Sequence, residues 1–413
     1  MKEPLFYTGE PVEPCDLMFR DDFIDIVWES LRQRHVLIAA PRRTGKTSVM
    51  NHLMEYPRHG FLVVSQNVQD FDHPAGLFQS LLENLYEQHN SVAERLIRGG
   101  WSLLKESRQW LGRNVESVGA GSFKIALRKT DPDWNANWKQ HADETLRQLR
   151  SIGQPMLLII DELPDLILNM RRHNEADLRD FLGWFRKIRQ DPPPSRDTIR
   201  WLIGGSTNIA STLDELGEVD LINDIAEEPL PVLSEEQVRE FVQRMLSCRG
   251  VDFSQTVPRR ISVRLGRPIP FFMQLVTQEV FRSWRREPRK ITTRDVDEIF
   301  DGMVTSQASQ GKLQHYHSRI SRYYLEPRQS AAYLLLSKLS LASDQGISRR
   351  ALQQLFLQHC SERGETSDSA SMRSQFNHLM RDLENDFYVS ECSKDQFDFS
   401  SGVMKSWWRK YYG

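Results

Sequence analysis

The segment His35-Val-Leu-Ile-Ala-Ala-Pro-Arg-Arg-Thr-Gly-Lys-Thr-Ser48 is the most informative part of this chain, because a short apolar run leads directly into a loop that ends in Gly-Lys-Thr. A loop of this kind wraps backbone N–H groups around the phosphates of a nucleotide. Its lysine supplies a point charge to the phosphates, and its threonine offers a hydroxyl to Mg²⁺. We therefore expect Lys46 to contact the phosphates and Thr47 to bind the metal. The predicted nucleotide-binding residues are Ala40, Pro41, Arg42, Arg43, Thr44, Gly45, Lys46, Thr47 and Ser48.

The loop departs at one position from the pattern Gly-x-x-x-x-Gly-Lys-Ser/Thr, since Ala40 stands where the first glycine belongs. Ala40 precedes Pro41, and a residue before proline is pushed toward extended conformations that a side chain with a Cβ can adopt. A glycine is then less necessary. The alternative is a chance Gly-Lys-Thr in a surface turn, but the strand-like run before it and the helix-compatible residues 47–53 after it favour the phosphate-binding interpretation.

A second apolar run, Pro155-Met-Leu-Leu-Ile-Ile-Asp-Glu-Leu163, has the composition of a strand buried on both faces and ends in two carboxylates. At the carboxyl end of a parallel strand beside the phosphate loop, Asp161 can hold a water on Mg²⁺. Glu162 can polarise the water that attacks the γ-phosphate, which makes it the predicted catalytic residue. Taken alone, the same pair could mark a helix start or a solvated end of a strand.

A third apolar run, Ile199-Arg-Trp-Leu-Ile-Gly-Gly-Ser-Thr-Asn208, ends in small and polar residues. In ATPases that insert a strand between the loop strand and the Mg²⁺ strand, a polar side chain at this tip contacts the γ-phosphate or the attacking water. Ser206 is the first candidate for that catalytic contact, followed by Thr207 and Asn208. An ordinary strand that ends in a turn is the alternative for each of them.

Strands alternate with helices through about residue 225, which predicts an α/β fold with a parallel sheet covered by helices on both faces. Ligands of such sheets bind beyond the carboxyl ends of the strands, where all three motifs end. We expect a P-loop ATPase core over residues 1–228. A capping box at Ser234–Gln237 then opens a helical lid over residues 229–312. Three helices and a hairpin in residues 313–413 follow the order of a winged helix.

The charge, the cysteine content and the apolar runs of the chain restrict which kinds of protein it can be. The 413 residues carry 54 Lys and Arg against 56 Asp and Glu, so any nucleic-acid binding must come from local patches. Four scattered cysteines, without a C-x-x-C pair, indicate neither a disulfide framework nor a zinc site. The N-terminus has no signal-like apolar stretch and no run approaches the ~18 apolar residues of a membrane span. We therefore expect a cytoplasmic protein that does not act in a membrane.

The motifs together resemble those of the archaeal-type AAA-like ATPases, close to the signal-transduction NTPases with numerous domains. The resemblance covers most of the chain. Its basis is the Pro41–Ser48 loop with its double arginine, the Ile160–Pro164 segment and Gly205-Ser206. It implies ATP and Mg²⁺ as cofactors. It also implies that Pro268, in the segment Leu265-Gly-Arg-Pro-Ile-Pro-Phe-Phe272, packs near the adenine.

Two features of this resemblance are less complete. Phe19 stands where the family has the glycine of a Gly-Arg-Glu box, so the resemblance assigns no nucleotide contact to Arg20. An arginine finger, which such enzymes usually supply from a neighbouring subunit, has no fixed position in the sequence. Arg196 and Arg200 are candidates beside the third apolar run, and Arg42 and Arg43 are candidates within the loop.

Three functions remain open at the level of sequence. The first is an oligomeric, nucleotide-driven switch in which ATP closes the lid and a separate effector protein is controlled. The second is a DNA-binding ATPase that uses the winged helix and the basic segment Arg282–Lys290. The third is a scaffold that binds nucleotide without hydrolysis, and the presence of both Lys46 and Glu162 argues against it. The four terminal aromatics Trp407, Trp408, Tyr411 and Tyr412 form either a partner-binding patch or, more commonly, a packed helix.

Overall fold

A computed structural model describes residues 4–98, 133–193, 196–205, 209, 213, 222–304, 307–365 and 368–413. The chain divides into two compact units. The first contains Met1–Phe19, Ala40–Gly45 and Leu230–Gly413, and the second contains Arg20–Ala39 and Lys46–Pro229. No helix in the described ranges is long and apolar enough to cross a membrane.

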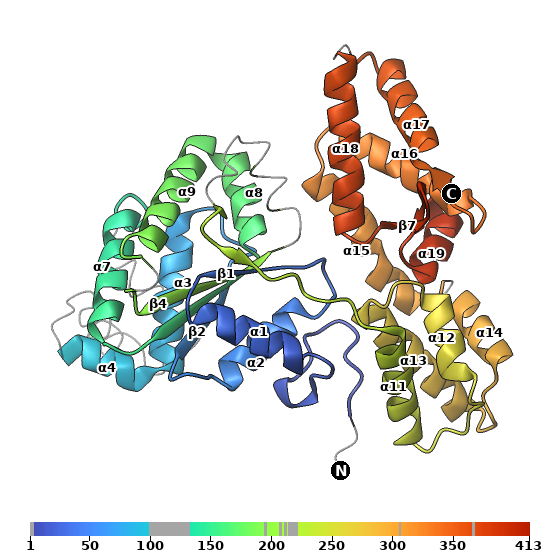
Figure 1. Cartoon of the computed structure of the whole chain (residues 1–413), viewed down its shortest axis with the longest axis horizontal. Helices are drawn as coiled ribbons and strands as arrows, with labels where there is room; N and C mark the ends of the chain where they lie inside the picture. The colour runs from blue at the N-terminus through green and yellow to red at the C-terminus, as the bar shows by residue number, and fades with distance from the viewer. Residues whose placement is uncertain are drawn as a thin grey trace. The chain divides into compact units, whose positions relative to one another are not determined.

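The second unit is built on a parallel five-stranded sheet, which confirms the α/β prediction (Figure 1). Its strands are β1 (Val36–Ala39), β2 (Leu62–Asn67), β3 (Met156–Asp161), β4 (Ile199–Gly205) and β5 (Ala226–Glu227). Their order is β2-β3-β4-β1-β5. The third apolar run therefore forms the strand that separates the loop strand β1 from the Mg²⁺ strand β3, as the sequence predicts.

Helices cover both faces of this sheet (Figure 1). They are α1 (Asp21–Leu31), α2 (Lys46–Glu55), α3 (Pro74–Gln88), α4 (Asn90–Arg98), α7 (Trp138–Ser151), α8 (Leu163–His173) and α9 (Glu175–Gln190). Leu37 and Ala39 of β1 join the apolar core that contains α3, α7, α8 and α9. The alternate residues Val36 and Ile38 are equally buried. Because successive side chains of a strand point to opposite faces, an apolar residue at every position of β1 means that both faces are covered.

The first unit is mainly helical. Before the C-terminal region it contains a short 3-10 helix, Pro14–Asp16, and the helices α11 (Glu235–Ser247), α12 (Val257–Leu265), α13 (Pro270–Arg286), α14 (Thr293–Met303) and α15 (Gln307–Tyr323). The predicted capping box is present at the start of α11, where Ser234 and Gln237 bond reciprocally. Thr292 and Asp295 form a second one at α14. These caps satisfy backbone N–H groups that have no partner within their helices.

The C-terminal region has the element order of a winged helix. It contains α16 (Arg328–Leu341), β6 (Ile347–Ser348), α17 (Arg349–Glu362), α18 (Ser369–Asn385), β7 (Val389–Ser393), β8 (Gln396–Phe399) and α19 (Gly402–Tyr412). The three strands form an antiparallel sheet in the order β6-β8-β7. Helix α19 follows the hairpin, in agreement with the sequence interpretation.

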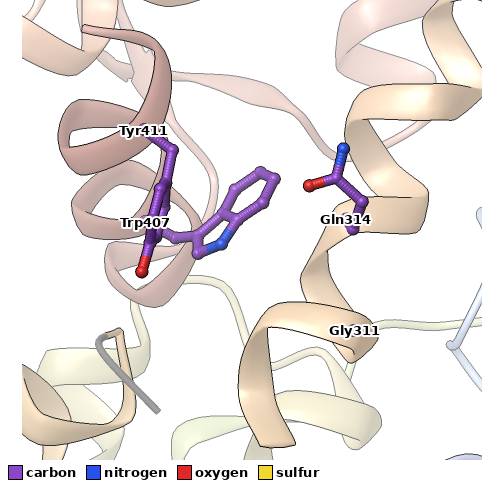
Figure 2. Close-up of a pocket in the computed structure, with 4 residues that line it drawn as sticks. All are labelled: Gly311, Gln314, Trp407 and Tyr411. Carbon is purple, nitrogen blue, oxygen red and sulfur yellow. The ribbon is translucent and has the colours of Figure 1, made fainter. Parts of the chain in front are cut away.

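Most of the aromatic side chains of α19 pack inside the first unit. Trp407 and Trp408 are 1% and 0% exposed, and Tyr412 stacks on His317 with ring centroids 3.9 Å apart. A pocket of ≈ 290 Å³ lies between α19 and α15, and Figure 2 shows the Trp407 ring pointing toward Gln314. Tyr411, at 36% exposed, is the most accessible of the four aromatics. The terminal aromatics are therefore mainly core residues of the first unit.

Candidate functional site

The phosphate-binding loop follows β1 in the chain and ends where α2 begins. Two of its residues, Arg43 and Gly45, have positive φ angles of 65° and 96°. A glycine tolerates this conformation at little cost, whereas an arginine there is strained. Ala40 is buried and is not among the residues with positive φ, so an alanine can replace the glycine of the usual pattern. The Thr44 hydroxyl closes the turn by donating a 2.6 Å hydrogen bond to the Pro41 carbonyl.

The second unit brings four of the predicted site residues together. Thr47 Oγ1 donates a 2.7 Å hydrogen bond to Asp161 Oδ2. The Lys46 ammonium lies 3.6 Å from both Asp161 Oδ1 and Glu162 Oε2. The side chains of Lys46, Asp161 and Glu162 are only 6%, 6% and 12% exposed. Charges held at this depth attract each other through a lower dielectric than surface charges do, and each would be costly to leave unpaired.

Glu162 is placed by an unusual backbone conformation. Its φ and ψ angles of 62° and 38° put it in the left-handed region, at the N-cap of α8. Its backbone N–H donates a 3.0 Å hydrogen bond to Asp161 Oδ1, which holds the Asp161 carboxylate against the backbone of Glu162. A left-handed conformation is costly for a non-glycine residue and persists where the surroundings enforce it. Here it turns the chain abruptly from β3 into α8.

A glycine on the neighbouring strand gives Asp161 its space. A Cβ atom on Gly204 would lie 2.5 Å from Asp161 Oδ1 and 2.5 Å from the terminal methyl of Met50. Contacts this short do not occur, so any larger residue would displace one of these side chains. The double glycine at the end of β4 was visible in the sequence as the end of a strand, but its role beside Asp161 was not predicted.

These residues fit Mg²⁺ and a nucleotide phosphate. Lys46 Nζ is buried and makes no hydrogen bond among the described residues, although it could donate three. The threonine hydroxyl and the aspartate carboxylate are oxygen ligands, which Mg²⁺ prefers, and it commonly binds through few protein ligands and retains waters. The described part of the chain contains no group of three or more His, Cys, Asp or Glu residues that could hold a metal by themselves.

The sensor residues cannot be placed. Ser206, Thr207 and Asn208 lie outside the described residues, and β4 ends at Gly205. A catalytic role for Ser206 stays a prediction from the sequence.

Pro268 lies in the first unit, in the turn between α12 and α13. Gly266 has a φ of 70° and forms a backbone bridge with Ser401. The guanidinium of Arg267 lies 3.9 Å from the centre of the Phe387 ring, and burial lowers its pKa. This turn therefore packs against the end of the β7–β8 hairpin. The contact of Pro268 with adenine stays a prediction.

At the place of the Gly-Arg-Glu box near the N-terminus, the backbone has a conformation typical of glycine. Phe19, which replaces the family's glycine, adopts a φ of 60°. This is the left-handed region that glycine enters readily. The neighbouring Arg20 is 5% exposed, and burial lowers its pKa to about 10.

The arginines considered as fingers differ in accessibility. Arg200 is 7% exposed and donates to the carbonyl oxygens of Asp197, Ile199 and Arg32, so it is a structural residue and is not available to a neighbouring subunit. Arg196 is exposed. Arg196 precedes β4 and Arg200 lies near its start. Both are therefore at the end of the strand opposite to the phosphate-binding residues.

Comparison with known proteins was made at the level of sequence and of structure. No family model matches the chain, and no curated protein matches its sequence. Many solved structures match the chain, and the two described next match its fold along almost the whole length. The Walker-type ATPase PABY2304 of Pyrococcus abyssi has a TM-score of 0.61 at 14% identity, over 98% of this chain and 99% of that one. The ORC2 protein of Aeropyrum pernix has a TM-score of 0.52 at 11% identity, over 97% and 95%.

These likenesses establish the fold. The chain has the fold of P-loop ATPases, with the parallel sheet followed by a mainly helical C-terminal region. At 14% identity or less, its activity has to be argued from its own residues.

Proposed function

We propose that this chain is a Mg²⁺-dependent ATPase. The observation that carries the proposal is the cluster of Lys46, Thr47, Asp161 and Glu162, joined by the 2.7 Å hydrogen bond from Thr47 to Asp161 and the two 3.6 Å ion pairs of Lys46. These are the residue types that phosphoryl transfer requires, and they come from the two motifs that the sequence singles out. A scaffold that only binds nucleotide would not need both the lysine and Glu162.

Each residue has a defined task in this proposal. Lys46 exchanges its ion pairs with Asp161 and Glu162 for the β- and γ-phosphates. Thr47 and Asp161 would hold Mg²⁺ with the hydroxyl and the carboxylate that their hydrogen bond brings together. Mg²⁺, when bound, neutralises charge that develops on the phosphates. Glu162, released from Lys46, orients the attacking water and accepts its proton. The same lysine would thus keep the general base occupied until the phosphates arrive.

We further propose that the ATPase acts as an oligomeric switch that controls a separate effector protein, as in the STAND-like NTPases. The supporting observation is that residues Ala40–Gly45 of the phosphate-binding loop belong to the same compact unit as the helical and C-terminal regions. The loop conformation and the C-terminal elements can then change together. In this proposal the effector activity resides in a partner protein.

DNA binding is the second candidate, because α16 to β8 follow the order of a winged helix. Two observations weigh against it. The third helix of that order, α18, carries Asp382 and Glu384 beside Arg381, so it is not strongly basic. In the basic segment Arg282–Lys290, Arg282 pairs with Glu279 and Arg289 with Asp295. Charges that are already neutralised release few counterions from DNA.

ATP hydrolysis by the purified protein, measured at several protein concentrations with and without duplex DNA, separates these functions. The switch predicts turnover that rises more than linearly with protein concentration and does not respond to DNA. Stimulation by DNA that vanishes in high salt would instead favour the DNA-binding ATPase. Absence of turnover under all conditions would overturn the ATPase proposal itself.

A further inference from the structure

The double arginine of the phosphate-binding loop is held by residues far along the chain. The guanidinium of Arg43 lies 4.0 Å from the centre of the Phe271 ring at the start of α13. Its Nε–H donates a 3.1 Å hydrogen bond to Nε2 of His315 on α15. Residues Ala40–Gly45 of the loop and both partners belong to the first unit. A planar guanidinium that stacks on a ring and donates in its own plane is fixed in both position and orientation.

The His315 ring is prepared to accept this bond. Its Nδ1 atom lies 2.7 Å from the carbonyl oxygen of Lys312, which can only accept, so the proton resides on Nδ1. Nε2 then keeps its lone pair and faces Arg43. Burial, with the nearby Arg43, lowers the pKa of His315 to about 3, so the ring stays neutral at physiological pH.

Arg42 is held on the same helix. Its guanidinium donates a 2.9 Å hydrogen bond to the hydroxyl of Tyr323, two turns beyond His315 on α15. The Tyr323 ring also lies 4.6 Å from the guanidinium carbon of Arg319. Both loop arginines therefore point to α15, through two different residues of that helix.

Helix α15 continues this contact into the winged helix. The Tyr388 hydroxyl, next to β7, donates a 2.6 Å hydrogen bond to the carbonyl oxygen of Tyr316. The buried Arg319 pairs with Asp386 at the end of α18, with 3.5 Å between their charged atoms. On α15, Tyr316 follows His315 in the chain, and Arg319 contacts the ring of Tyr323. These contacts therefore adjoin the two residues that hold the loop. The loop arginines, α15 and the start of the hairpin thus form one continuous set of polar contacts.

We propose that Phe271, His315 and Tyr323 form a seat for the loop arginines, and that Arg42 and Arg43 position the phosphate-binding loop through this seat instead of binding the phosphates themselves. This inference rests on the proposed nucleotide site. Arg43 occupies a strained left-handed conformation, and the seat supplies contacts that offset this strain. Gly45 is bonded to Lys46, so the loop backbone that the seat fixes leads directly into the phosphate-binding lysine. His315 is therefore a positioning residue, which acts through Arg43.

A double-mutant cycle between Arg43 and His315 tests the seat, with ADP binding measured by calorimetry on the full chain. The variants are Arg43→Ala, His315→Ala and the double variant. We expect each single change to weaken ADP binding about tenfold, because a charge-assisted hydrogen bond is lost. The double variant should bind ADP with about the affinity of the single variant that binds it less tightly, since the two residues act as one unit.

Rescue distinguishes positioning from general damage to the fold. His315→Gln retains an amide oxygen that can accept from Arg43 and an N–H that can donate to Lys312, so it should recover most of the affinity. Phe271→Leu keeps the apolar volume but removes the aromatic face, and it should weaken ADP binding without loss of α-helical circular dichroism. Arg286→Ala, an exposed arginine on α13, is the matched control and should bind ADP like the wild type.

Two outcomes would overturn the seat. If Arg43→Ala weakens ADP binding while His315→Ala and Phe271→Leu leave it unchanged, Arg43 contacts the phosphates directly. If the losses at Arg43 and His315 are additive, the two residues do not act through each other. Because ADP binding is measured without turnover, a wild type that binds ADP but hydrolyses no ATP would contradict the ATPase proposal and still allow the seat to be tested.

Discussion

Thr47 and Asp161, which are 114 positions apart in the chain, are joined by a hydrogen bond of 2.7 Å between the threonine hydroxyl and Oδ2 of the carboxylate. This bond connects the first turn of α2 with the end of β3. It places both proposed Mg²⁺ ligands within a few ångströms of Lys46. The loop motif and the carboxylate motif, each ambiguous when taken alone, therefore belong to one site.

The first prediction concerns these two ligands. Thr47→Val and Asp161→Asn should each raise the Mg²⁺ concentration needed for half-maximal ATP hydrolysis by at least tenfold, because each change removes an oxygen ligand or its charge. A Mg²⁺ titration at saturating ATP measures this. Thr145→Val is the control, since that hydroxyl only bonds within α7 to the carbonyl of His141. An unchanged Mg²⁺ requirement in Asp161→Asn would remove Asp161 from the metal site.

The second prediction concerns the space beside Asp161. Gly204→Ala should lower the turnover number by tenfold or more, because the new Cβ would lie 2.5 Å from Asp161 Oδ1 and from Met50. Gly183→Ala on α9 is a matched control, since a Cβ there has no atom within 4 Å. It should leave turnover unchanged and stabilise the helix by about 0.5–1 kcal/mol. Wild-type turnover in Gly204→Ala would show that Asp161 needs no exact placement.

The third prediction concerns pH. His35 is fully buried, and burial lowers its pKa to about 4. Its two ring nitrogens are bonded to the Arg189 carbonyl and to the Trp201 N–H. The unfolded chain binds a proton at this residue below about pH 6.5, whereas the folded chain does not until about pH 4. The free energy of unfolding should therefore fall as pH decreases through this range, by a few kcal/mol at most.

Urea denaturation at pH 7.0 and 5.0 measures this loss, with His35→Gln as the comparison. The glutamine variant starts from a lower stability, but its stability should depend less on pH, because the titrating group is gone. Equal pH dependence in both proteins would exclude His35 as a source of the acid sensitivity.

The core strands were predictable because buried strands are encoded by runs of consecutive apolar residues. β1 is apolar throughout, and β3 and β4 are apolar along most of their length, as strands covered on both faces are. The order of three helices and a hairpin near the C-terminus was predictable for a similar reason, since helical apolar spacing gives way to two short strand-like segments. The carboxylates at the end of β3 followed from the strand itself, because the end of a strand in a parallel sheet faces the ligand.

The parts that could not be predicted depend on long-range contacts. Nothing local marks Phe271, His315 or Tyr323 as partners of a loop more than 200 residues away. The left-handed conformation of Glu162 is likewise imposed by its surroundings, because glutamate has no preference for it. The strand β5, only two residues long, carries too little sequence to form a pattern.

The most direct test of the central claim measures ATP binding and hydrolysis together in Glu162→Gln and Lys46→Ala. Glutamine keeps the size of Glu162 but cannot accept the proton of the attacking water, so this variant should bind ATP with near wild-type affinity and hydrolyse it at least 100-fold more slowly. Lys46→Ala should lose affinity for ATP, because the phosphates lose their cation. Wild-type turnover in Glu162→Gln would contradict the account of this site as the centre of ATP hydrolysis.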